Sequence, residues 1–381
     1  MDVPSIPEKK PPMILPLTGV RALAAVMVLF LHGSQNFPNV LGEWPLFSRG
    51  YLGVDLFFLL SGVVISHVYL NEMARLNLAN ARVFLWHRII RIWPAHVVVL
   101  ASMMVMMAVV GALHIPFAHP EAFLWRDVPW HLLLLQAWGF NDTASWNGPS
   151  WSVSAEWFAY LLFPLLAPIL VRLPRLAALA GSALSLGLLA LGFISQELSL
   201  AAAWNGVPPL ARISAEFLAG ALAYRALLHD GGTVFARRFG GALAVLGLAG
   251  FLAGSLTGVN DFVLLAALLA LLVGLYPGRG VMAGLFSLPL FVWLGELSYS
   301  IYIVHSPILL VTRKALERLG LVPTSEPMRL VLFLAVMAII LLAATLLHRL
   351  VEKPFRQLWR DRYGRINGQA VGATLVPELR P

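Results

Sequence analysis

The chain has 381 residues, of which 59% are hydrophobic and only 12% are charged, and it contains no cysteine. Soluble domains carry about 25% charged residues, roughly twice the fraction found here, so this much apolar surface cannot be buried in one aqueous core. Without cysteine there is no disulfide framework, thiolate metal site or sulfur nucleophile. The formal net charge of +8 does not indicate a nucleic-acid-binding protein, because a basic patch needs an aqueous face on which to lie.

Apolar stretches of about 17 to 25 residues, the length that crosses a bilayer as a helix, recur along nearly the whole sequence. They predict an all-α, polytopic integral membrane protein with about ten transmembrane helices. We expect these at 14–33, 51–70, 92–112, 151–171, 175–194, 208–228, 241–258, 260–276, 289–311 and 328–350. The connection at 113–150 contains an apolar patch that is too short to cross, and we expect it to re-enter the membrane or lie in the interface.

Lysine and arginine resist translocation, so the side on which they collect predicts the orientation of the spans. An even number of spans puts both termini in the cytoplasm, and the inner segments then hold most of the basic residues, with the group at 313–318 as the chief exception. We therefore divide the chain into a cytoplasmic N-terminal segment at 1–13, a transmembrane domain at 14–350 and a basic cytoplasmic tail at 351–381.

The first span contains two ionisable residues, Arg21 and His32. Eleven residues advance a helix by roughly three whole turns, so both side chains lie on one face about 16 Å apart. Arg21 then offers an anion-binding group toward the cytoplasm, and His32 offers a titratable base toward the outer leaflet. The alternative is a snorkelling arginine and a helix-end histidine that water solvates.

Two carboxylates lie near the outer ends of other spans. Asp55 in the second span can meet His32 and fix the tautomer of its ring, or it can be an N-terminal carboxylate that the helix dipole favours. Glu156 lies about one turn inside the fourth span and needs a partner at that depth, for which His32 and Arg49 are candidates; a structural ion pair is the alternative. Close helix approach is expected at Gly50, Gly53 and Gly62.

Two arginines lie at the cytoplasmic flank of the third span. Arg88 and Arg91 are three residues apart, so their guanidinium groups can grip a diphosphate together. A positive-inside anchor would look much the same, and Trp86 and Trp93 beside it fit an aromatic belt.

The ninth span carries a polar stripe. Ser298, Tyr302 and His305 fall on one helical face, with Tyr299 adjacent. Such a stripe either lines a cavity for the substrates or forms hydrogen bonds between helices. We assign Tyr299, Tyr302 and His305 as substrate contacts, together with Trp151 at the start of the fourth span.

Taken together, these segments resemble the membrane-bound acyltransferase-3 family, which O-acylates polysaccharides, peptidoglycan, lipid-linked sugars and some macrolides. The matching segments are Arg21 with His32, Gly50 to Gly62, Arg88 to Pro94, Asn147 to Tyr160, Ser298 to Pro307 and Glu352 to Pro354. The resemblance implies that His32 is the essential histidine, Arg21 its partner motif, and Arg88 with Arg91 the acyl-CoA contacts. The family commonly has a further basic residue before Arg88, where His87 stands in this chain.

On this resemblance we expect an O-acyltransferase that moves an acyl group, in the first instance acetyl, from cytoplasmic acyl-CoA to a hydroxyl of an extracytoplasmic carbohydrate or glycoside. His32 would act as general base, with Asp55 or Glu156 orienting its ring, or would form an acyl-histidine. We expect no metal and no permanently bound cofactor, since acyl-CoA is a co-substrate. The expected partners are the two substrates and the lipid of a bacterial inner membrane, with no nucleic acid; homo-oligomerisation stays open.

Two other classes of function are compatible with about ten spans and buried polar groups. One is a secondary transporter or an exporter of lipid-linked sugars, and the other is a non-catalytic membrane scaffold. The transporter class usually shows internal repeats, which are not visible here, and a scaffold would gain nothing from the cost of intramembrane histidine and glutamate.

Overall fold

The computed structural model describes residues 13–36, 45–116, 119–140, 145–321 and 325–366. Residues 1–12 of the predicted N-terminal segment and 367–381 of the predicted tail lie outside this part of the chain. The described residues form helices and connecting turns without any strand, which confirms the all-α class.

Eight helices are long and apolar enough to cross a membrane. They are α1 (Leu15–Asn36), α3 (Leu52–Tyr69), α4 (Leu78–Ala112), α6 (Trp151–Leu170), α7 (Arg175–Ser195), α9 (Val234–Thr257), α12 (Pro289–Leu319) and α13 (Glu326–Leu347). The predicted spans at 208–228 and 260–276 correspond to the shorter helices α8 (Val207–Ala223) and α10 (Asp261–Leu275). The chain is therefore an integral membrane protein, and the number of about ten spans stays a prediction, as does the position of the termini.

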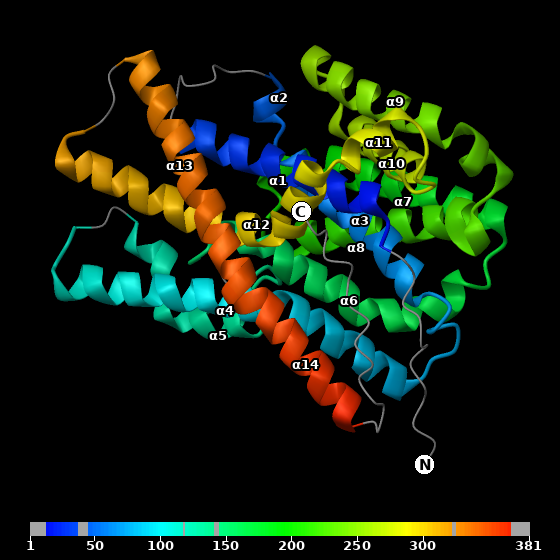
Figure 1. Ribbon diagram of the computed structural model, residues 1–381, viewed down its shortest axis with the longest axis horizontal. Coiled ribbons are helices and arrows are strands. Elements are labelled where there is room, and N and C mark those ends of the chain that lie inside the picture. The colour runs from blue at the N-terminus through cyan, green and yellow to red at the C-terminus, as the bar shows by residue number, and fades with distance from the viewer. Residues whose placement is uncertain (1–12, 37–44, 117–118, 141–144, 322–324, 367–381) are drawn as a thin grey trace.

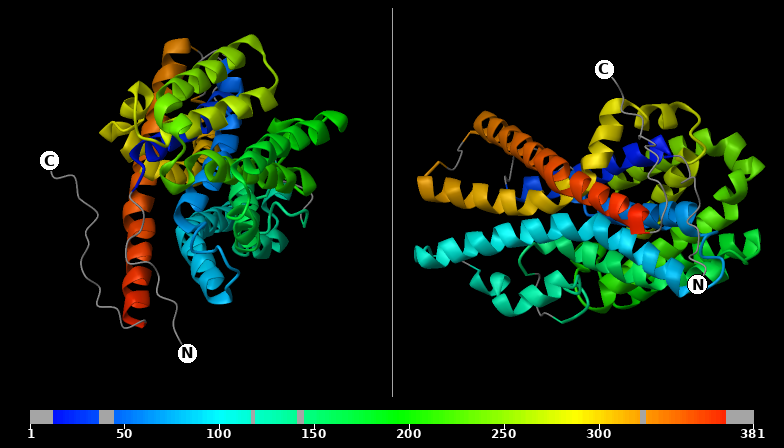
Figure 2. Two further views of the ribbon diagram at one scale, coloured as in Figure 1. Left: turned by 90° about the vertical axis from the view of Figure 1, so that its right-hand side faces the viewer. Right: turned by 60° about the horizontal axis from the view of Figure 1, so that its bottom comes forward.

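The helices pack in a bundle in which α1 contacts both α3 and α12 (Figure 1). Helix α3 also packs on α8, and α9 pairs with α10. Helices α4, α12 and α13 project together at one end of the molecule, away from α7 and α9 (Figure 2). Helix α13 continues through a single π-helical turn, η7 (His348–Glu352), into α14 (Lys353–Ile366).

Glycines set the closest helix contacts around α1. A Cβ atom added at Gly53 on α3 would lie 2.5 Å from the carbonyl oxygen of Ala24, and one at Gly295 on α12 would lie 1.9 Å from that of Thr18. Both distances are far below van der Waals contact, so only glycine lets these backbones meet. The expected close approach at Gly53 is confirmed, and α1 is held tightly between its two neighbours.

The connection between α4 and α6 folds onto the bundle with short elements. It contains the 3₁₀ turns η1 (Pro120–Phe123), η2 (Trp125–Asp127) and η3 (Gly148–Ser150), and the five-residue helix α5 (Val128–Leu132). Trp93 Nε1 donates a hydrogen bond of 2.9 Å to the carbonyl of Leu132, and His96 Nε2 lies 3.0 Å from that of His131. None of these described elements is long enough to cross a bilayer, as the sequence predicts.

Burial sets the charge state within this connection. The ring of His131 is only 1% exposed and its Nε2 lies 2.9 Å from Ser145 Oγ. Burial lowers the pKa of His131 to about 3, with a smaller contribution from neighbouring His96. The ring is therefore neutral at physiological pH and serves to hold the segment in place.

Candidate active site

A pair of histidines lies where α1 meets α12. Nδ1 of His32 is 3.2 Å from Nε2 of His305 and 3.1 Å from the carbonyl oxygen of Val28. Nδ1 of His305 lies 2.6 Å from the carbonyl oxygen of Tyr302. The two rings are 5.0 Å apart, and His305 is buried while His32 is half-buried.

The structure gives Asp55 a different partner from the one expected. Both of its oxygens accept hydrogen bonds from Arg212 on α8, at 2.7 and 2.5 Å, and Arg212 also donates to the carbonyl of Leu200. Glu216, one turn further along α8, has an oxygen 3.7 Å from Arg212 Nε. Asp55 therefore belongs to a buried ion cluster, and the prediction that it meets His32 is wrong, because a full guanidinium outcompetes a neutral ring for a carboxylate.

Arg212 and Glu216 were missed in the sequence as members of the ion cluster that holds Asp55. They are four residues apart inside the predicted span at 208–228, so they share a face of that helix. Ionisable groups at that depth require partners, which is the signal that could have identified them.

Glu156 is also paired differently from expectation. One of its oxygens accepts hydrogen bonds from Ser61 on α3, at 2.8 Å, and from Tyr160 one turn below, at 2.5 Å. The two suggested partners, His32 and Arg49, are both engaged elsewhere, which makes that prediction wrong. Hydroxyl donors satisfy Glu156 without a formal ion pair.

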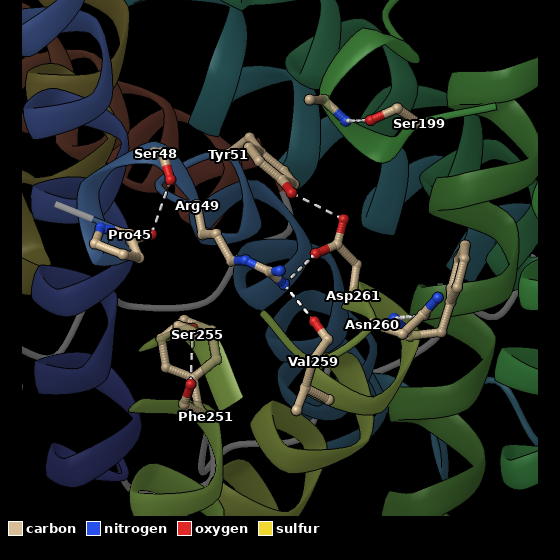
Figure 3. Close-up of polar contacts among 12 residues, drawn as sticks. Pro45, Ser48, Arg49, Tyr51, Ser199, Phe251, Ser255, Val259, Asn260 and Asp261 are labelled. Atoms are coloured by element: carbon tan, nitrogen blue, oxygen red, sulfur yellow. Dashed lines mark hydrogen bonds and ion pairs between the residues drawn. The ribbon is translucent and has the colours of Figure 1, made fainter. Parts of the chain in front are cut away.

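Arg49 forms its own cluster with the start of α10. Its Nη1 donates to Asp261 Oδ1 at 2.7 Å and to the carbonyl of Val259 at 2.6 Å, while the hydroxyl of Tyr51 donates to Asp261 Oδ2 at 2.8 Å (Figure 3). Asp261 lies in the first turn of α10, where the helix dipole also favours a carboxylate. The cluster fastens α10 to the segment that precedes α3.

Arg21 lies on the predicted face of α1. Its Nε donates to Ser298 Oγ on α12 at 3.2 Å. The guanidinium is within electrostatic range of Arg91, Glu156 and Glu352, yet none of these is close enough to form an ion pair with it. Arg21 is half-buried, so part of its guanidinium stays available to another group.

Arg88 on α4 is held mainly by aromatic rings. Its guanidinium lies 5.3 Å from the centre of the Tyr69 ring and 5.9 Å from those of Phe84 and Tyr160. Its Nη2 donates to the Tyr69 hydroxyl at 3.2 Å, while Nε has no hydrogen-bond partner among the described residues. Cation–π contacts position the charge but leave the Nε donor unused by the described residues.

Arg91 has a carboxylate partner. Its Nη1 donates to Glu352 at 2.9 Å, and Glu352 also accepts from Ser300 and Arg356 and lies 3.5 Å from His348 Nδ1. Glu352 reaches α4 from the π-helical turn η7, and π turns recur at functional sites. The structure thus brings both predicted donor arginines to one region but leaves only Arg88 without an ion-pair partner.

The four residues assigned as substrate contacts are involved in packing. The Tyr302 hydroxyl donates to the carbonyl of Pro149 at 2.8 Å and accepts from Ser152, and the Tyr299 hydroxyl donates to the carbonyl of Ile92 at 2.5 Å. The ring of Trp151 lies 5.3 Å from the guanidinium of Arg212. The stripe on α12 therefore forms hydrogen bonds between helices, which is the alternative that the sequence left open.

No group of three or more histidine, aspartate or glutamate side chains in the described ranges could hold a metal ion. Among the described residues, the ionisable groups around α1 are Arg21, Arg88 and Arg91, the carboxylates paired above, and the rings of His32 and His305. An all-helical membrane bundle with ionisable side chains along its interior defines a membrane enzyme or a transporter.

Comparison with known proteins separates these two classes. The chain belongs to the acyltransferase-3 family, whose model, described as an acyltransferase domain, matches residues 15–349. It is therefore a membrane-bound O-acyltransferase. No solved structure matches the chain.

Three relatives illustrate the range of the similarity. Acyltransferase MdmB from Streptomyces mycarofaciens is 28% identical over 367 residues, which covers 90% of this chain and 91% of that protein. The peptidoglycan O-acetyltransferase OatA of Listeria monocytogenes serovar 1/2a is 29% identical over 160 residues, 39% of this chain and 23% of its own length. Protein 2 in the picA locus of Rhizobium radiobacter is 34% identical over 96 residues, 25% of this chain and 47% of that protein.

Proposed function

We propose that this enzyme transfers an acyl group, in the first instance acetyl, from cytoplasmic acyl-CoA to a hydroxyl of an extracytoplasmic carbohydrate or glycoside. The proposed location is the bacterial inner membrane, which the chain crosses several times. The observation that carries the proposal is that a bundle of acyltransferase-3 type holds Arg88, Arg21 and His32 half-buried inside its helices. A peptidoglycan O-acetyltransferase among the relatives supports a carbohydrate acceptor.

The donor end of the site is assigned to Arg88. A guanidinium with unused donors is suited to a phosphate, which accepts two parallel hydrogen bonds from it. Arg91 can contribute to the same site only if it leaves Glu352. Arg21 lies about 16 Å from His32 along α1, and we assign its positive charge to a contact with the CoA arm.

The chemistry is assigned to His32. The neutral ring accepts the proton of the acceptor hydroxyl while the oxygen attacks the thioester carbonyl. The carbon–sulfur bond then breaks, and the CoA thiolate takes the proton back from the imidazolium. In the other route His32 first attacks the thioester itself and the alcohol then attacks the acyl-imidazole. Both routes yield an ester and free CoA, and both require an unprotonated nitrogen.

The test uses the full chain in proteoliposomes, with radiolabelled acetyl-CoA supplied on one side and a mixture of glycosides on the other. The wild type should release CoA in an acceptor-dependent manner, and His32→Ala should lower this rate by about 10³-fold, the range of general acid–base catalysis. The matched control is His119→Ala, because the side chain of His119 is 75% exposed in the connection before α6. Undiminished turnover by folded His32→Ala would eliminate the assignment, and solute counterflow without CoA release would favour a transporter.

A further inference from the structure

We propose that His305 is a positioning residue that holds His32 in the tautomer protonated at Nδ1, so that Nε2 of His32 is the nitrogen that reacts. The proposal rests on the proposed role of His32. It reassigns His305, which the sequence suggested as a substrate contact, and it replaces Asp55 and Glu156 as the groups that orient the ring.

The proton of His305 is fixed by the backbone. Its Nδ1 lies 2.6 Å from the carbonyl oxygen of Tyr302, and a carbonyl oxygen can only accept a hydrogen bond. A neutral His305 ring therefore carries its proton on Nδ1 and presents a lone pair at Nε2. The side chain is only 1% exposed, so the only described group that Nε2 meets is His32.

The proton of His32 follows from this arrangement. Its Nδ1 faces two acceptors, the carbonyl of Val28 at 3.1 Å and Nε2 of His305 at 3.2 Å. With the proton on Nε2 instead, three lone pairs would point at one another without a hydrogen between them. With the proton on Nδ1 it is shared between both acceptors, and this is the favoured tautomer.

The remaining nitrogen of His32 is free for chemistry. Nε2 has no hydrogen-bond partner among the described residues, and the side chain is half-buried, so this nitrogen is not sealed by protein. When Nε2 accepts the hydroxyl proton, the Nδ1 proton strengthens its bond to His305 and spreads the positive charge over two rings. When the thiolate takes the Nε2 proton, the pair returns to its starting state.

The contact between α1 and α12 keeps the two rings in register. The backbones touch at Thr18 and Gly295, about four turns from His32 on α1 and about three turns from His305 on α12. Because both helices are rigid over that distance, the pair is positioned by the bundle and not by substrate. The hydrogen bond between the rings therefore exists before either substrate arrives.

The test compares His305→Leu, which removes the acceptor, with His305→Gln, whose side-chain oxygen can still accept from Nδ1 of His32. We expect His305→Leu to lower kcat about 100-fold and to leave KM for acetyl-CoA unchanged. A serine-protease triad that loses its tautomer-setting carboxylate loses ~10⁴-fold in kcat. The loss expected here is smaller because a neutral imidazole stabilises the imidazolium less than a carboxylate does. His305→Gln should recover at least one tenth of wild-type kcat. In ¹⁵N spectra of histidine-labelled protein, His32 Nδ1 should be protonated in wild type and in His305→Gln, and mixed in His305→Leu.

The outcomes separate this inference from the proposed function. If His32→Ala is inactive while folded His305→Leu keeps wild-type kcat, the positioning role is overturned and the base stands. If the glutamine and leucine variants lose kcat equally and His32 keeps one tautomer in both, His305 acts only through packing and the inference fails. Retained turnover in His32→Ala would remove the assignment of His32 as the base, on which this inference rests, and would leave the acyl transfer itself standing. Size-exclusion profiles identify variants that fail to fold.

Discussion

Two groups of charged side chains lie inside the bundle, and they differ in their burial and in whether they have an ion-pair partner. Asp55, Arg212 and Glu216 are 0–1% exposed and are clustered around one guanidinium. Arg21 and Arg88 are half-buried, and each keeps donors that no described side chain uses.

The difference separates charge that holds helices together from charge that can act on a substrate. A sealed ion cluster is hard to remove because each member compensates another in a medium of low dielectric constant. A half-buried charge with unused hydrogen-bonding capacity can accept a ligand at little cost to the fold. We therefore assign the first group to stability and the second to catalysis, and three predictions test this assignment.

The largest expected effect is on the sealed cluster. Arg212→Gln should destabilise the protein by about 3–5 kcal/mol, because it leaves Asp55 buried without its counter-ion. The measurement is thermal unfolding of purified protein by intrinsic fluorescence. Arg175→Gln, at the exposed start of α7, is the matched control and should change stability by less than about 0.5 kcal/mol. The double variant Arg212→Gln with Asp55→Asn should lose less unfolding free energy than the two single variants lose together. Strictly additive losses would contradict a coupled pair.

A smaller effect, on substrate binding and not on stability, is expected at Arg88. Arg88→Gln should raise KM for acetyl-CoA about 10- to 100-fold, the range of one charge-assisted hydrogen bond of about 1.5–3 kcal/mol. Arg91→Gln is the comparison, since its guanidinium is bound to Glu352, and KM should rise less than about 3-fold while the melting temperature falls. A larger rise in KM for Arg91→Gln than for Arg88→Gln would mean that Arg91 leaves Glu352 and binds acetyl-CoA.

The smallest effect is expected at the cluster of Arg49 and Asp261, which is intermediate between the two groups. Both side chains are slightly under one fifth exposed, so Arg49→Gln should cost about 1 kcal/mol of stability and leave kcat unchanged. Unfolding and turnover of the same preparation give both values. A loss of kcat beyond about 3-fold would place this cluster in the catalytic group and break the proposed division.

The fold could be predicted from the sequence because membrane helices are defined locally. Each of the ten apolar runs forms a helix among the described residues, and helical periodicity placed Arg21 and His32 on one face. The contact of Arg21 with Ser298 then followed from which helix lies beside α1. That neighbour could not be predicted, since spacing along one helix carries no information about the helix it packs against.

The partners inside the site were missed for the same reason. Asp55 and Arg212 are separated by 157 positions, and Arg91 and Glu352 by 261. A single sequence predicts that such groups need partners but does not say which of several is nearest. His305 appeared in the polar stripe of its span, yet only the packing of α12 against α1 brings its ring to His32.

The π-helical turn η7 has a consequence for how this part of the chain tolerates changes in length. A π turn holds one more residue than an α turn over the same rotation, so it takes up that residue as a local bulge. Deleting one residue between 348 and 352 would restore regular winding and remove the bulge from which Glu352 reaches Arg91. Losing one amino acid here should therefore be more harmful than most replacements, and homologous chains should keep the spacing of this turn even where its side chains vary.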